Sequence, residues 1–187
     1  MKPSKIIITI IASSLGLSLQ AETFKIDPVH SSVIFSVKHL GVSNVYGRFN
    51  DVSGKVVLDK SDASKSSIEV TIPVESIDTR NQKRDQHLKS PDFFNAKQFP
   101  VIVFKSKEVK GSGETYQVTG DLTLHGVTKP LSLEIKDVVE GKEMEGESRG
   151  GGETHFTIKR SDFGMDFMQG PVGDEVKVML SLEGVKQ

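Results

Sequence analysis

Alternation of apolar and polar residues constrains the fold of this chain more than any other feature. The pattern is clearest in residues 67–74, where Ile68, Val70, Ile72 and Val74 occupy every second position. Because successive side chains of a β-strand point to opposite faces, this period indicates strands with one apolar face. Further strands are predicted at residues 24–26, 33–39, 45–49, 55–58, 101–109, 116–124, 131–135, 156–158 and 176–182.

Many strands with one apolar face each must close around a shared interior. The Gly, Ser and Asp residues between the segments suit hairpin connections, which favour antiparallel pairing. A closed barrel buries the apolar faces without leaving an unpaired edge. An immunoglobulin-like sandwich is the alternative, but its Cys and Trp core markers are missing. The sequence therefore predicts an all-β fold, with a barrel as the favoured architecture.

The first residues predict a secretory signal peptide at residues 1–21. Lys2 and Lys5 precede an apolar run, and the segment ends in the small residue Ala21. The run is shorter than the ~20 apolar residues that a membrane span needs. We therefore expect cleavage near Ala21, a periplasmic location, and one mature domain over residues 22–187 with no membrane span.

Charge and cysteine content exclude several classes of function. The formal net charge is −1 with both signs interspersed, so no basic stripe is present that could neutralise the phosphates of a nucleic acid. The chain has no cysteine, which excludes thiol catalysis, cysteine metal sites and disulfides. Packing alone must therefore hold the domain together.

The alternation stops between residues 75 and 99. Thr79 or Asn81 can cap a short helix that runs to about Leu88. Ser90, followed by a proline, can cap a second short helix that ends before Pro100. We therefore expect a short helical insertion at about residues 79–98.

The same insertion concentrates Asp85, His87 and Asp92, a grouping that resembles an active site. On a helix, however, Asp85 and His87 would point about 160° apart, so they cannot jointly hold a metal ion or share a proton. These charges are better interpreted as groups that orient the insertion.

Two other patterns bear on catalysis. Ser148 lies in "GESRG", which matches the nucleophile-elbow string, but the apolar strand before it and the helix after it are missing, so a loop is predicted. His30, His39 and His125 each lie near a strand end, where they could converge in space. Two interpretations remain open for them: a metal-assisted hydrolase or isomerase site, or histidines that bond to nearby backbone.

Several longer motifs, in this order and spacing, resemble the YceI-like family of exported, polyisoprenoid-binding proteins. They are "IDPVHSSVIFSVKHLGVSNVYGRF" (26–49), "SIDTRNQKRDQHLKSPDFFNAKQFPVIVFKS" (76–106), "GDLTLHGVTKPL" (120–131), "KRSDFGM" (159–165) and "VGDEVKVML" (172–180). The resemblance implies an eight-stranded antiparallel, lipocalin-like barrel. It also implies a cavity for an isoprenoid quinone-like lipid or a similar long-chain amphiphile, with no catalytic residue, cofactor or metal.

Alternation also predicts which side chains would contact such a ligand. We expect the cavity to be lined by Phe35, Val37, Phe94, Phe104, Leu122 and Phe156. His39, Arg84 and Asp85 are expected near its mouth or in the helical insertion. The leading hypothesis is therefore a periplasmic lipid carrier that is not an enzyme. A solid barrel that acts through its exposed loops is a third reading, and a homodimer is an assembly that the sequence leaves open.

Overall fold

The alternating segments form strands along most of the chain. The structure is a computed structural model that describes residues 21–142 and 146–187, so the predicted signal peptide lies outside the described residues except for Ala21. The strands are β1 (Glu22–Ile26), β2 (Ser32–His39), β3 (Ser43–Phe49), β4 (Ser53–Leu58), β5 (Ser67–Pro73), β6 (Ile77–Asp78), β7 (Val101–Ser112), β8 (Thr115–Leu124), β9 (Val127–Lys142), β10 (Ser148–Lys159) and β11 (Val172–Lys186). The helices of these ranges are α1 (Gln82–Lys89) and the 3-10 helices η1 (Ala63–Lys65), η2 (Val74–Ser76) and η3 (Arg160–Phe163).

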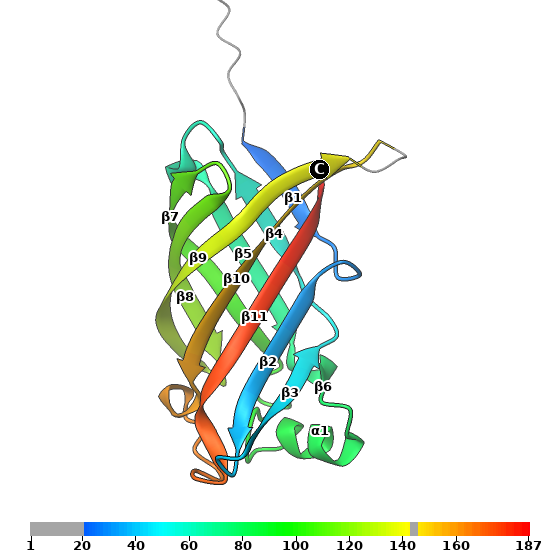
Figure 1. Cartoon of the computed structure of the whole chain (residues 1–187), viewed down its shortest axis with the longest axis vertical. Coiled ribbons are helices and arrows are strands. Elements are labelled where there is room, and N and C mark those ends of the chain that lie inside the picture. Colours follow the sequence, from blue (N-terminus) through cyan, green and yellow to red (C-terminus); the bar gives the residue numbers. More distant parts are fainter. Residues whose placement is uncertain (1–20, 143–145) are drawn as a thin grey trace, which may run out of the picture.

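Eight of the strands close into a barrel (Figure 1). The order around it is β1, β4, β5, β7, β8, β9, β10 and β11, and the pairing of β1 with β11 completes the ring. Every ladder of the ring is antiparallel. The eight-stranded antiparallel barrel expected from the sequence is therefore confirmed.

Strand β11 holds the ring together because three strands pair with it. Strand β10 follows one edge of β11, while the other edge pairs with β2 over Val172–Ser181 and with β1 over Gly184–Lys186. Strand β2 in turn pairs with β3, and β3 pairs with the short β6. Figure 1 shows β11 running from the end of the barrel that carries α1, called here the lower end, to the upper end, where the C-terminus lies.

The inner face of the barrel carries the apolar set that the alternation predicted. Val70 and Val74 are buried, and Ile68 and Ile72 pack against the same core. Val118 on β8 has no exposed surface at all. Removal of this apolar surface from water is the main stabilising contribution in a domain without disulfides.

One of the two expected helices forms. The Asn81 side chain accepts a hydrogen bond from the Arg84 amide and begins α1, as an N-cap should. The second predicted helix is wrong, because residues 91–99 form turns. Asn95 adopts a left-handed backbone (φ 48°), and its amide and that of Phe94 donate back to Ser90 and Leu88 at the end of α1. No helix within the described ranges has the length and apolar character to cross a lipid bilayer.

The loop predicted around Ser148 is also wrong. Ser148 begins β10 and pairs with Lys142 of β9, and only Gly146 and Glu147 precede it as irregular backbone among the described residues of this string. A strand, and not a helix, follows Ser148. The nucleophile-elbow geometry is therefore not formed, as the sequence context indicated.

Candidate ligand-binding cavity

An apolar cavity of about 150 Å³ lies inside the barrel. All eight strands of the ring contribute to its wall. Among the lining side chains are Phe24, Val70, Phe104, Leu122, Phe156 and Leu180. A concave, apolar space of this kind is the usual form of a small-molecule site.

The cavity exists because the inner face of β10 changes from small to large residues. Gly150, Gly152 and Thr154 face inward in its upper half, followed by Phe156 in the lower half. A Cβ atom on Gly150 would lie 2.9 Å from the Phe24 ring, so that ring occupies the space that the glycine leaves free. Phe24 thus borders the cavity toward the upper end, and its ring packs against the backbone of Gly150.

An aromatic group fills the interior on the side of α1. The Phe49 ring lies 5.7 Å from that of Phe35 and 5.8 Å from that of Phe94, centroid to centroid. Phe94 comes from the turns that follow α1, so the insertion plugs the lower end of the barrel, in agreement with its position in Figure 1.

The predicted lining residues divide into two sets. Phe104, Leu122 and Phe156 lie in the cavity wall. Phe35 and Phe94 belong to the apolar core but lie outside that wall, as does the half-buried Val37. Contact of any of these six with a ligand stays a prediction.

The predicted polar residues lie at the lower end, away from the cavity wall. His39 is exposed at the end of β2. Arg84 donates from Nε to Thr79 Oγ1 (2.8 Å) and from Nη2 to the Thr79 carbonyl (2.7 Å), and Asp85 accepts from the Thr79 amide (2.9 Å). Thr79 itself is buried. Arg84 and Asp85 therefore fix α1 to the segment after β6, which is the orienting role inferred for the insertion.

The three-histidine metal site is not formed. His30 precedes β2 and His39 ends it, so a strand of about 25 Å separates them at ~3.3 Å per residue. His125 lies in the β8–β9 turn, where its Nδ1 is 3.0 Å from the Phe163 carbonyl. The alternative of a hydrolase built on His30, His39 and His125 is thus contradicted by their positions.

A chain of ion pairs lies across the upper end of the cavity. Lys60 Nζ is 2.6 Å from Glu140 Oε1 and 3.6 Å from Glu22, and Glu22 also pairs with Lys186 at 2.5 Å. The Lys186 hydrogen bond holds the pKa of Glu22 below its ordinary value, and the Glu140 hydrogen bond raises the pKa of Lys60. Because Glu140 also lines the cavity, a charged rim borders the apolar interior.

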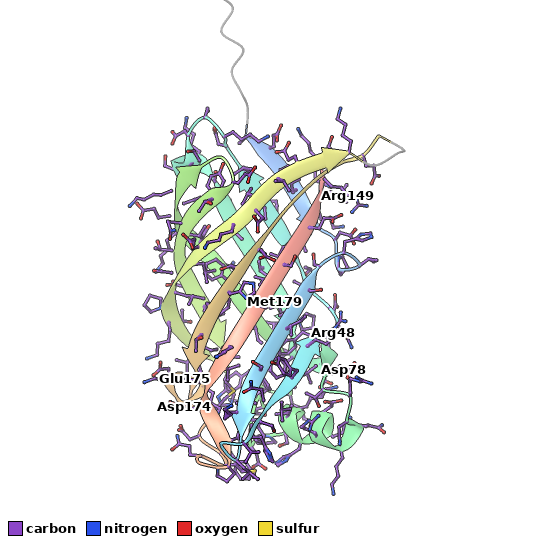
Figure 2. The ribbon with its side chains drawn as sticks, in the orientation of Figure 1. Arg48, Asp78, Arg149, Asp174, Glu175 and Met179 are labelled. Atoms are coloured by element: carbon purple, nitrogen blue, oxygen red, sulfur yellow. The ribbon has the colours of Figure 1, made fainter. Side chains whose placement is uncertain are left out.

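A second polar group, the Arg149 cluster, consists of Asp27, His30, Arg149 and Glu183. Figure 2 shows Arg149 at the upper end of β10. Its Nη1 donates to Asp27 (2.7 Å) and to Glu183 (2.8 Å), which joins β10, β11 and the turn after β1. The cluster borders an open outer hollow of about 450 Å³ that reaches Gly150–Gly152 from outside the barrel.

Asp27, His30 and Glu183 offer three potential metal ligands within 4.8 Å of one another. The guanidinium of Arg149 already pairs with both carboxylates, at 2.7 Å from Asp27 and 2.8 Å from Glu183. A cation placed there would have to compete with this fixed positive charge for the carboxylate oxygens of Asp27 and Glu183. We therefore assign the Arg149 cluster to closure of the barrel.

We expect Asp27→Asn to lower the free energy of unfolding by about 1 kcal/mol near neutral pH. Hydrogen bonds from His30 and Arg149 hold the pKa of Asp27 below 3.8, so its contribution is present above pH 3.8 and is lost as acid protonates it. The Asp27 hydrogen bond raises the pKa of His30 above 6.5, so that contribution is present below pH 6.5 and is lost as the ring deprotonates.

Stability should therefore be highest between these two pH values and should fall on both sides. Urea unfolding across this range measures the profile. Asp51→Asn, at an exposed aspartate, is the matched control and should leave the profile unchanged. An Asp27→Asn protein with the wild-type profile would contradict the assigned role of the cluster.

Sequence reasoning missed several residues that line the cavity. They are Phe24, Tyr116, Gly150, Gly152, Thr154, Val178 and Leu180. One signal could have found some of them, because every second residue counted back from Phe156 gives Thr154, Gly152 and Gly150 on the same face.

Comparisons with known proteins agree with this architecture. The YceI-like domain model matches residues 24–184. A UPF0312 protein of Pseudomonas aeruginosa is 41% identical over 187 residues, which cover 96% of this chain and 98% of the relative. The crystal structure of Burkholderia cenocepacia BcnA has a TM-score of 0.74 at 25% identity and covers 84% of this chain and 98% of its own.

A polyisoprenoid binding domain from Saccharophagus degradans has a TM-score of 0.68 over 88% of this chain and 98% of its own. At 15% identity, this likeness shows a shared fold alone. The family model covers nearly all of the described barrel, and the Pseudomonas relative matches over almost its full length. The chain therefore belongs to the YceI-like family.

Proposed function

We propose that this protein binds an isoprenoid lipid, or a similar long-chain amphiphile, and carries it in the periplasm. The observation that carries the proposal is the apolar cavity, whose wall is built by all eight strands. The YceI-like resemblance implies an isoprenoid as the class of ligand, and a polyisoprenoid binding domain from Saccharophagus degradans shares the fold. The predicted signal peptide supports the location.

The size of the cavity sets a condition on this binding. A cavity of about 150 Å³ is known to hold one benzene molecule. The present cavity, also about 150 Å³, therefore has room for about one isoprene unit. A longer chain enters only if lining side chains move, and Phe24, which rests against the bare backbone of Gly150, is the side chain placed to do so.

Affinity should come mainly from the tail. At ~25 cal/mol per Å², burial of 400 Å² of prenyl chain contributes ~10 kcal/mol before the costs of ordering, whereas one hydrogen bond contributes about 1 kcal/mol. The charged rim of Glu22, Lys60, Glu140 and Lys186 offers polar partners at the upper end of the cavity. This distribution favours an amphiphile, and it favours binding over catalysis.

The test is organic extraction of the protein, purified from a periplasmic fraction, followed by mass spectrometry of the extract. We expect an isoprenoid or another long-chain lipid in near-stoichiometric amount. The tyrosine fluorescence of delipidated protein should also be quenched when an isoprenoid quinone is added. Repeated absence of lipid, together with no uptake of the quinone, would favour a barrel that acts through its exposed loops.

A further inference from the structure

Thr154 presents a buried hydroxyl to the apolar cavity. The residue is only 4% exposed, and it lies in the cavity wall on the inner face of β10. Its Oγ1 has no hydrogen-bond partner among the described residues. A buried hydroxyl without a partner is destabilising, and such groups are uncommon in native structures.

The neighbour of Thr154 on the adjacent strand β11 is apolar. Its partner in the β10–β11 ladder is Leu180, which also lines the cavity. The β9–β10 ladder ends one residue earlier, at Glu153 paired with Lys136, after a bulge opposite Gly152. No residue of β9 therefore pairs with Thr154. Its hydroxyl lies beside the cavity where the ladder between β9 and β10 ends.

We propose that Thr154 is a specificity-determining residue that hydrogen-bonds an oxygen atom of the ligand inside the barrel. This inference rests on the proposed lipid-binding function and deepens it. The ligand class is then an isoprenoid or long-chain compound with a hydroxyl or carbonyl group that enters the cavity. A lipid whose polar atoms all remained at the charged rim would leave Thr154 without a partner.

The experiment compares two probes on two variants. The probes are farnesol and farnesene, which share a branched apolar skeleton and differ in the hydroxyl group. The variant is Thr154→Val, which keeps the shape of the side chain and removes its hydroxyl. Thr157→Val makes the same change at an exposed position of the same strand and is the control. Affinities are measured with delipidated protein by displacement of a fluorescent fatty-acid probe.

We expect Thr154→Val to weaken farnesol binding about fivefold to tenfold and to leave farnesene binding within about twofold of wild type. Thr157→Val should change neither affinity. The melting temperature of the unliganded Thr154→Val protein should equal or exceed that of wild type, because a partnerless hydroxyl has been removed.

Three outcomes would overturn the inference. Equal losses for both probes, or no loss for farnesol, would show that Thr154 does not recognise an oxygen, while wild-type binding of farnesene would leave the proposed function standing. Failure of the wild-type protein to bind either probe would overturn the inference and the proposed function together.

Discussion

Arg160→Met is expected to lower the free energy of unfolding by about 3 kcal/mol, because it removes a buried charged donor from four carbonyls in a buried or partly buried network. Arg160 is 4% exposed at the start of η3. Its Nε donates to the Gly173 carbonyl (3.0 Å) and its Nη2 to that of Val172 (3.1 Å), while Nη1 donates to the carbonyls of Met165 and Phe167. One guanidinium thus fixes the whole segment between η3 and β11.

Denaturant unfolding at neutral pH measures this effect. Lys159→Met is the matched control, because it makes a similar change at the preceding, exposed residue and should alter stability by less than about 0.5 kcal/mol. Arg160→Lys should be intermediate, since an ammonium group cannot reach four carbonyls at once. An Arg160→Met protein as stable as Lys159→Met would show that this segment is held by other contacts.

Val178→Phe is expected to weaken lipid binding about tenfold or more. Val178 lines the cavity and pairs with Phe156 on one side and Phe35 on the other, so a larger ring at this position projects into the space that the tail would fill. If the ring excludes about 60 Å² of tail surface, the loss at ~25 cal/mol per Å² is about 1.5 kcal/mol, or about tenfold in Kd.

Lys177→Phe places the same ring one residue earlier, on the exposed outer face of β11, and should leave affinity unchanged. Titration of delipidated protein with an isoprenoid quinone gives both values, and circular dichroism checks that each variant is folded. Equal affinities of the two variants would place the binding site outside the barrel interior.

Local patterns in the sequence were sufficient to locate the strands of the ring, but not the start of β10 at Ser148, where a loop was predicted. The period of two located all eight strands of the ring, because it reflects the geometry of each strand by itself. The His125–Gly126 turn is equally local, because both residues adopt the left-handed backbone (φ 52° and 75°) of a two-residue hairpin. The Asn81 cap is likewise a local signal.

The depth of a side chain along the barrel was not predictable from such patterns. Alternation correctly turns Phe35 toward the core, but its pairing with Val178 of β11 and its ring contact with Phe49 decide whether it meets the cavity. The glycines of β10 gave no strand signal, since residues without side chains show no alternation. The environment of the Thr154 hydroxyl and the hydrogen bonds of Arg160 depend in the same way on residues that lie elsewhere in the chain or in irregular backbone.

The position of β11 has a consequence for how the protein is made. Glu22 of the first strand bonds to Lys186, 164 positions later in the chain. Contacts of such long separation slow folding, because the intervening loop must be ordered before they form. The ring can therefore close only after β11 has been synthesised, and until then the inner apolar faces of the earlier strands have no closed barrel to share.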